Sequence, residues 1–277
     1  MIKVFLLVSV LAMGCELPAQ KSGSRSSHSF SDHFDAGLEV SNGWFAIEYG
    51  RKENLKLVTD TARAGAKALK ITLRKNDPES QYGNKRTELT YNYYPDSKLI
   101  DTTLRWYGFS NYFPSTYGAD PAEEIIAQWH ISSPKCGASP TLAIEIKDDH
   151  FRAVVRFSTA DYCDSPKSIV QKIFDLGPVK KDSWMDWKIQ YNPNTNASGR
   201  IQIWRNDSSV LKYSGPCQYI GSPFPYFKIG LYKWCWMPGW TGTQSKQEER
   251  TYFLDEVMIG ANKSDIRRPA GKGRPAL

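Results

Sequence analysis

The stretch Tyr226-Phe227-Lys228-Ile229-Gly230-Leu231-Tyr232 alternates between two kinds of side chain. Its second, fourth and sixth residues are apolar, whereas the residues between them are tyrosine, lysine or glycine. Successive side chains of a β-strand point to opposite faces of the sheet. The stretch therefore predicts a strand that buries one face in a hydrophobic core and presents the other face to solvent or to a ligand.

Similar short alternations continue along the chain from residue 30. Gly, Pro, Asn and Asp separate them, and no long segment has the period of a helix. We expect strands over residues 67–74, 86–91, 104–113, 124–131, 141–147, 151–157, 184–191, 199–205, 226–232 and 251–259, a hairpin over 200–213 and a short helix over 120–127. The 277 residues fit one domain. We predict an all-β fold, an antiparallel β-jelly-roll sandwich of the concanavalin-like type, formed as a single domain.

The N-terminus combines a basic start with an apolar run. Lys3 precedes the apolar residues 4–13, and Gly14 and Cys15 follow them. The run is shorter than the roughly 20 apolar residues of a membrane span and is typical of a secretory signal. We expect export to the periplasm, the cell surface or the medium. The ending Leu11-Ala12-Met13-Gly14-Cys15 resembles a bacterial lipoprotein box, and this resemblance implies a lipid on Cys15. The expected organisation is a signal over 1–15, a flexible tether over 16–29, the jelly-roll domain over 30–262 and a basic disordered tail over 263–277.

Four cysteines follow Cys15, and an even number in an exported chain favours two disulfides. Proximity in the sequence suggests the pairs Cys136–Cys163 and Cys217–Cys235, although four cysteines allow three pairings and the sequence does not choose among them. A zinc site is disfavoured, because no Cys-x-x-Cys or paired-histidine spacing occurs.

The formal net charge of +7 is spread along the chain. A basic surface raises the local concentration of a polyanion. Export argues against nucleic acid, so we expect an anionic polysaccharide as the partner. We also expect a monomer that contacts a membrane only through the N-terminal lipid.

Three segments place polar residues on strand faces, over residues 85–89, 125–130 and 226–233. Alternation puts certain side chains of each segment on one face. These are Arg86 with Glu88, Gln128 with His130, and Lys228 with Gly230 and Tyr232. If the three strands lie in one curved sheet, these side chains share its concave face, where Gly230 would leave room for a sugar ring.

These residue types suit β-elimination on a uronate sugar. The C5 proton is weakly acidic, so the neighbouring carboxylate must be neutralised, and Arg86 and Gln128 can donate hydrogen bonds to it. His130 or a deprotonated tyrosine can remove the proton, and the Tyr232 hydroxyl can protonate the departing oxygen. Lys228 would lower the pKa of Tyr232 and ease both roles.

Each residue also has a purely structural interpretation. Arg86 and Glu88 can form a structural ion pair. A histidine in a strand is commonly a core or rim residue, and a tyrosine in a strand commonly packs. The argument for chemistry therefore rests on the whole set of residues.

At these segments the sequence resembles the jelly-roll polysaccharide lyases, a group that includes alginate, glucuronan and heparin-I-type lyases. The resemblance rests on Arg-Thr-Glu-Leu at 86–89, Gln-x-His at 128–130 and Tyr-Phe-Lys-x-Gly-x-Tyr at 226–232, and extends loosely over residues 30–262. It implies a lyase that cuts a uronate polymer without a cofactor for the chemistry. The implied residues are Tyr232, His130, Gln128 and Arg86 for catalysis, Lys228, Tyr226, Lys233 and Glu88 for substrate binding, and Asp255 for a structural Ca²⁺ away from the groove. His130 is implied as base or as neutraliser according to the epimer cut. Tyr232 is implied as the acid, or as both acid and base where the elimination is syn, so the choice of base between the two residues stays open.

Two positions depart from the alginate lyases. Trp129 follows Gln128 where those enzymes commonly have Ile or Val, and Lys233 follows Tyr232 where they often have Asn-Gln. Both positions lean toward the glucuronan and heparin branch. The gaps between the expected strands are too short for the thumb-like insertion of heparin-I-type lyases. A glucuronan-like or other uronate polymer is therefore favoured.

Two other functions fit the same fold class. A jelly-roll glycoside hydrolase needs paired carboxylates on one strand face, but Lys147 stands where the partner of Glu145 should be. A non-catalytic carbohydrate-binding module would share the fold and the aromatic residues, but it would not need Arg, Gln, His, Lys and Tyr together. The identity of the polymer and endo or exo action stay open.

Overall fold

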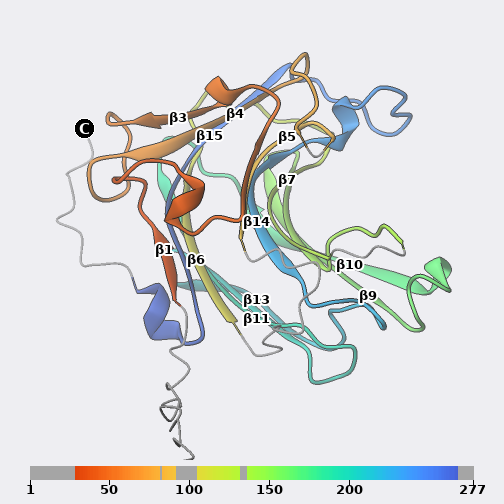
Figure 1. Ribbon diagram of the computed structural model, residues 1–277. Coiled ribbons are helices and arrows are strands. Elements are labelled where there is room, and N and C mark those ends of the chain that lie inside the picture. The colour runs from red at the N-terminus through yellow and green to blue at the C-terminus, as the bar shows by residue number, and fades with distance from the viewer. Residues whose placement is uncertain (1–28, 82, 92–104, 132–135, 268–277) are drawn as a thin grey trace, which may run out of the picture.

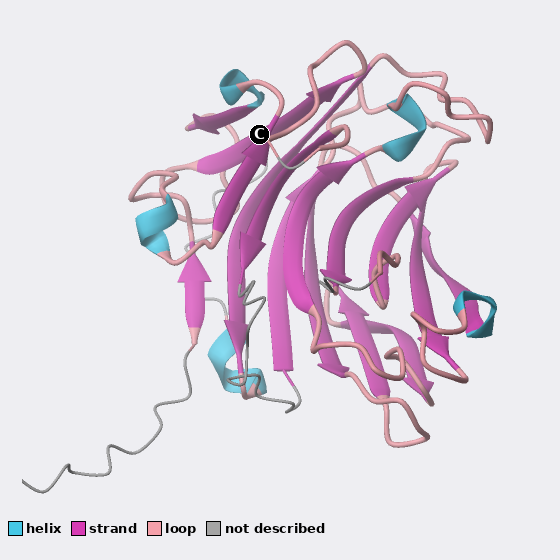
Figure 2. Ribbon diagram, turned by 45° about the vertical axis from the view of Figure 1, so that its right-hand side comes forward, coloured by secondary structure: helices cyan, strands magenta, loops and turns pink. Residues whose placement is uncertain are grey.

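The computed structural model describes residues 29–81, 83–91, 105–131 and 136–267. Over these residues the chain forms two antiparallel sheets, and its helices are short 3-10 turns at the periphery (Figures 1 and 2). The turns are η1 (Val40–Asn42), η2 (Lys52–Asn54), η3 (Pro166–Ser168), η4 (Trp234–Trp236) and η5 (Lys263–Ile266).

We call the larger sheet the back sheet. Its strands run in the order β13-β12-β11-β6-β15-β4-β3, and β1 pairs with β15. Their bounds are β1 (Phe30–Asp32), β3 (Leu55–Val58), β4 (Ala68–Arg74), β6 (Arg105–Tyr112), β11 (Trp184–Asn192), β12 (Arg200–Arg205), β13 (Ser208–Ser214) and β15 (Glu249–Gly260).

We call the other sheet the front sheet, in the order β10-β9-β8-β7-β14-β5-β2. Its strands are β2 (Ala46–Tyr49), β5 (Arg86–Tyr91), β7 (Glu124–His130), β8 (Leu142–Lys147), β9 (His150–Ser158), β10 (Ile169–Pro178) and β14 (Tyr226–Tyr232). Figure 2 shows its strands bending along their length. The three polar segments of the sequence thus lie in adjacent strands, with β14 between β7 and β5.

The core lies between the two sheets and is built from the apolar faces of their strands. Trp129 of β7 and Phe227 of β14 are buried, and the ring centroid of each lies 5.0 Å from that of Tyr107 in the back sheet. Aromatic rings at such distances add to the stabilisation from burial. The predicted antiparallel all-β sandwich is confirmed.

The helix predicted over residues 120–127 is wrong, because β7 begins at Glu124. The Glu124 carboxylate is fully buried, with its Oε2 2.8 Å from Nε of Arg250 and 3.3 Å from Nζ of Lys233. These partners lie far along the chain, so the local pattern does not reveal the constraint that holds Glu124 at a strand end.

The sequence pattern also misses β1, β2, β3 and β10. The first three are only three or four residues long, too short for a clear period. β10 is an edge strand with exposed apolar residues, such as Ile173 at 50% exposure. Its alternation therefore does not separate a buried face from an exposed one.

The domain extends beyond the predicted boundary at residue 262. In η5 the side chain of Ile266 is fully buried and packs with Trp106 and Met258. The predicted signal, almost all of the tether, Cys15 and the tail beyond residue 267 lie outside the described residues. Within the described part of the chain, no helix has the length and hydropathy needed to cross a membrane.

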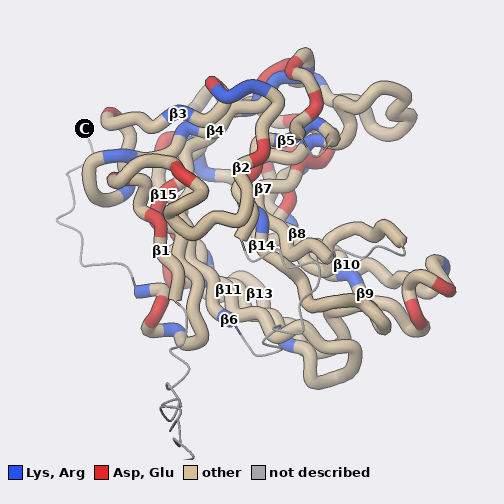
Figure 3. Tube along the Cα trace, viewed as in Figure 1, with Lys and Arg blue, Asp and Glu red and all other residues tan. Residues whose placement is uncertain are grey.

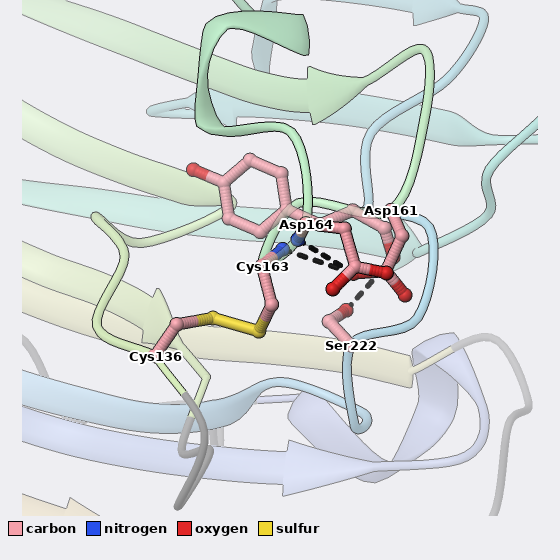
Figure 4. Close-up of a disulfide and its surroundings, with 6 residues drawn as sticks. Cys136, Asp161, Cys163, Asp164 and Ser222 are labelled. Carbon is pink, nitrogen blue, oxygen red and sulfur yellow. Dashed lines mark hydrogen bonds between the residues drawn. A yellow bond between two sulfur atoms is a disulfide. The ribbon is translucent and has the colours of Figure 1, made fainter.

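One predicted disulfide is confirmed and the other is wrong. Cys136 and Cys163 are bonded, beside a turn in which Asp161 accepts the backbone N–H of Cys163 at 2.9 Å (Figure 4). Cys217 and Cys235 are buried free thiols. The seven-residue strand β14 lies between Cys217 and Cys235 in the chain and spans roughly 24 Å. The two cysteines are therefore held near opposite ends of β14, although they are close in the sequence.

Candidate active site

The open face of the front sheet, which points away from the back sheet, carries the polar side chains of β14. Tyr226, Lys228 and Tyr232 alternate there with core residues such as Phe227 and Leu231. Tyr226 lies opposite His130 of β7, Lys228 lies opposite Gln128, and Tyr232 lies opposite Arg86 of β5. Because of this register, the predicted catalytic residues form one continuous patch.

Gly230 has a different role from the one predicted. It lies in a β-bulge between β14 and β7, with φ of +145°. A Cβ at this position would lie 2.2 Å from the backbone oxygen of Thr87. Glycine is therefore required by the close approach of β5 and not by the need for space around a sugar.

A cluster of four charged side chains occupies the centre of this face. Nζ of Lys228 lies 2.8 Å from Glu48 and 2.8 Å from Glu88. Nη1 of Arg86 lies 3.5 Å from Glu48 and 3.4 Å from Glu88. We call these four residues the charge cluster. In Figure 3, basic and acidic segments lie close together around β2, β5 and β14.

Glu48 was not found from the sequence, because β2 is one of the missed strands. The surrounding stretch Trp44-Phe45-Ala46-Ile47-Glu48-Tyr49 is apolar at its first four positions, so no alternation marks a polar face that would have shown it. Glu48 is 4% exposed, and its carboxylate accepts a hydrogen bond from the Thr90 hydroxyl at 2.6 Å.

Gln128 supports the cluster from beneath. Its side chain is completely buried, and its amide nitrogen donates to Glu88. Its oxygen Oε1 is buried without a hydrogen-bond partner among the described residues, and so is Nε of Arg86. Buried polar atoms without partners are costly, so these two groups are a local cost of packing the charge cluster against β7.

A tyrosine flanks the cluster on each side. The guanidinium carbon of Arg86 lies 4.5 Å from the ring centroid of Tyr232. The Tyr226 hydroxyl lies 3.4 Å from Nδ1 of His130. The ring of Trp234 stands 5.6 Å from that of Tyr232, which adds an apolar edge to this side of the patch.

Burial lowers the pKa of His130 to about 4, helped by Lys228 and Arg86 and opposed by the hydrogen bond to the Ile131 carbonyl. The imidazole is therefore neutral at neutral pH. A carbonyl oxygen can only accept a hydrogen bond, so Nδ1 carries the proton and Nε2 keeps its lone pair. This form of His130 can accept a proton.

Burial raises the pKa of Tyr232 above its ordinary value of 10.0, although Arg86 acts in the opposite direction. The prediction that neighbouring cations lower the pKa of Tyr232 overall is wrong, because burial and the Glu88 carboxylate outweigh Arg86. Tyr232 therefore keeps its proton at neutral pH, as a general acid must.

A pocket of about 250 Å³ opens beside the charge cluster. Its lining comes from β2, β5, β14 and the residue before β2, and consists of Phe45, Ala46, Glu48, Arg86, Thr90, Tyr226 and Lys228. Pockets that hold drug-sized ligands measure roughly 300–1,000 Å³, so this pocket suits a smaller group such as one sugar unit. Phe45 is 45% exposed at its wall.

A family model described as polysaccharide lyase matches residues 31–258. The chain belongs to the polysaccharide lyase family. A search of curated proteins gave no match. The lyase aligns with an endo-β-1,4-glucuronan lyase from the fungus Trichoderma reesei, with a TM-score of 0.66 and 23% identity over 87% of this chain and 97% of that one.

Two further solved structures are similar to this lyase. The cellulose induced protein Cip1 aligns with a TM-score of 0.52 and 11% identity, over 84% of this chain and 97% of that one. A family 7 alginate lyase aligns with a TM-score of 0.49 and 14% identity, over 76% and 84% of the two chains. At these identities the likeness to the glucuronan lyase and to Cip1 shows the fold alone.

Lys233 of the lyase is not a substrate-binding residue, contrary to the sequence prediction. It is completely buried, with Nζ 2.9 Å from Asp120, 3.3 Å from Glu124 and 3.1 Å from the Ala122 carbonyl oxygen. By alternation it lies on the face opposite Tyr232, so it fixes the end of the strand from the core side. Glu88 is also fully buried, and it acts through Lys228 and Arg86.

Asp255, the predicted calcium ligand, lies in β15 of the back sheet, and its role as a calcium ligand stays a prediction. It is fully buried, and its oxygens accept the backbone N–H groups of Arg63, Ala64 and Glu256 at 2.7–3.3 Å. Burial raises the pKa of Asp255 to about 7, and the neighbouring Glu256 carboxylate acts in the same direction. Across the described ranges, no group of three or more His, Cys, Asp or Glu side chains is placed to hold a metal.

Proposed function

We propose that this polysaccharide lyase cleaves a uronic-acid-containing anionic polysaccharide by β-elimination and leaves an unsaturated uronate at the new end. The observation that carries the proposal is the placing of two cations between a neutral histidine and a protonated tyrosine on one open face. The fold shared with a glucuronan lyase supports a glucuronan-like polymer as the first substrate to test.

In the proposed reaction, Arg86 and Lys228 hold the uronate carboxylate, and Gln128 positions Glu88 beneath them. Neutralising this carboxylate stabilises the enolate-like intermediate that forms when C5 loses its proton. Arg86 and Lys228 both line the pocket beside the cluster. Lys228 uses two of its three N–H groups on Glu48 and Glu88, and it can donate the third.

His130 then takes the C5 proton on Nε2, and Tyr232 gives its proton to the glycosidic oxygen on C4. The C4–O bond breaks, the electron pair of the C5–H bond forms the C4=C5 double bond, and no water is added. Arg86 stabilises the phenolate left on Tyr232 through its charge above the ring. Solvent restores both protonation states. None of these steps needs a cofactor.

The proposal also includes the binding partner, the cellular location and the oligomeric state of the enzyme. An anionic polymer is its partner, and the net charge of +7 favours their encounter. Export, a lipid on Cys15 and a monomeric state complete the proposal, and they rest on the sequence pattern of the N-terminus and on the size of the domain.

A panel of uronate polymers tests the reaction. Glucuronan, alginate, heparin-type chains and ulvan are incubated with the protein, and the ultraviolet absorbance of the C4=C5 double bond is followed together with reducing ends. Both signals should rise in parallel on at least one polymer. Reducing ends without absorbance would indicate a hydrolase, and binding without products would indicate a binding module.

A further inference from the structure

The cations of the charge cluster are already matched by carboxylates of the chain itself. Lys228 lies 2.8 Å from both Glu48 and Glu88, and Arg86 lies 3.4–3.5 Å from the same two residues. The four side chains carry no net formal charge. A bound uronate carboxylate adds one negative charge to this neutral set. None of the four residues is then left as an unmatched cation for a second anionic group on the substrate, such as a sulfate.

Glu48 and Glu88 are placed differently with respect to the pocket. Glu88 is completely buried, with its Oε1 bonded to Gln128 and its Oε2 to Lys228 and Arg86. Glu48 lines the pocket. Glu48 is therefore the carboxylate of the cluster that a sugar in the pocket can touch.

The two oxygens of Glu48 are not equally occupied. Oε1 accepts from Lys228 at 2.8 Å and from the Thr90 hydroxyl at 2.6 Å, whereas the contact of Oε2 to Arg86 is a long 3.5 Å. A carboxylate has about four acceptor sites on its two oxygens. Oε2 thus keeps capacity for a further donor, and a sugar hydroxyl is such a donor.

We propose that Glu48 is a specificity-determining residue that selects a uronate unit with free hydroxyl groups and rejects the same unit carrying a sulfate ester. The inference rests on the proposed function and narrows its substrate class to unsulfated uronate polymers. A hydroxyl donates to Glu48. A sulfate ester removes that donor and places an anion against a buried carboxylate, and like charges in contact oppose binding.

The test uses short glucuronan chains and the same chains after chemical O-sulfation, so that the two substrates differ only in the ester. The wild-type kcat/KM should favour the unsulfated chains by about a hundredfold. Glu48→Gln should lower this preference by about tenfold or more, because the amide carries no charge and can donate to sulfate. Glu48→Asp should keep the preference, because it keeps the charge.

Glu53→Gln is the matched control. Glu53 lies on the exposed turn η2, just after the strand that carries Glu48, so the substitution makes the same change of net charge outside the pocket. It should leave the preference unchanged. Equal wild-type rates on both substrates would overturn the proposal, and so would a Glu48→Gln variant with wild-type selectivity.

Failure of the proposed function is recognised separately. If no uronate polymer is cleaved, calorimetric binding of the two chains replaces the rate measurement, and equal affinities would still overturn the role of Glu48. Circular dichroism verifies that each variant is folded. If Glu48→Gln does not fold, Glu48→Ala takes its place. If neither variant folds, the wild-type preference between unsulfated and sulfated chains decides.

Discussion

The guanidinium of Arg86 lies 4.5 Å from the ring centroid of Tyr232, across the β5–β14 ladder. This distance is within the range of a cation–π interaction. A group that can bind a carboxylate and a phenol that keeps its proton therefore stand side by side. A phenolate formed at Tyr232 would be stabilised at the same place where the substrate carboxylate is held.

Tyr232→Phe should lower kcat by about 10²–10⁴-fold, because the ring stays in place and only the proton donor is lost. Substrate binding and the melting temperature should change little, since the contacts with Arg86 and Trp234 involve the ring. Tyr112→Phe on the back sheet, whose hydroxyl lies 3.3 Å from Asp182, is the control and should keep full activity. An active Tyr232→Phe enzyme would remove Tyr232 from the acid role.

The rate should depend on pH through His130, whose pKa in the folded protein is about 4 against an ordinary 6.5. The base must be neutral, so kcat/KM should decline only as the pH approaches 4. The exposed His150, hydrogen-bonded to Asp175, offers the control variant His150→Asn, which should leave the profile unchanged. An acid limb near 6.5 would contradict a buried, neutral His130.

The free energy of unfolding should also depend on the pH through His130, and it should fall as the pH falls. Between pH 6.5 and about 4 the unfolded chain binds a proton at His130 that the folded chain does not. The free energy of unfolding therefore falls as the pH drops through this window, and this contribution stays constant above it. Urea titrations of the wild type and His130→Asn should keep a constant difference above pH 6.5, and the wild type should lose stability relative to the variant as the pH falls toward 4. Parallel curves would show that His130 is not the group responsible.

Much of the patch could be predicted because alternation along a strand is a local property. Gln128, His130, Lys228 and Tyr232 lie on the face that their spacing assigns. Glu48 could not be placed, because its contact with Lys228 depends on β2 pairing with β5 at the sheet edge. The burial that raises the pKa of Tyr232 was equally invisible, since it depends on how the sheet packs.

Lys233 shows where the family resemblance misled the prediction. Its position directly after Tyr232 suggested a role at the substrate, but strand alternation turns it toward the core. The partners that make a buried lysine stable there, Asp120 and Glu124, come from a segment whose pattern indicated a helix. The ion pairs of Lys233 with Asp120 and Glu124 thus explain both the buried position of Lys233 and the extended conformation of the segment that was predicted to be a helix.

Lys233→Met should therefore destabilise the fold by about 3–5 kcal/mol, because it leaves buried carboxylates without one of their cations. Chemical denaturation measures the loss. Lys246→Met, at an exposed position of the neighbouring loop, should cost almost nothing. Equal stability of the two variants would show that the buried pair with Glu124 is not structural.

Replacing both Cys136 and Cys163 by serine should lower the free energy of unfolding by roughly 3–4 kcal/mol, as expected for opening a link across 27 residues. Mass mapping of non-reduced peptides should find this bond and no bond between Cys217 and Cys235, which are buried thiols. A disulfide-linked Cys217–Cys235 peptide pair would contradict the separation of the two thiols by the length of β14.

The mass of the products made from glucuronan tests the central claim most directly. Elimination predicts a non-reducing end that is lighter by one water than the saturated sugar and absorbs ultraviolet light, formed by the wild type and lost in Tyr232→Phe. Products with saturated ends, each heavier by one water, would contradict β-elimination.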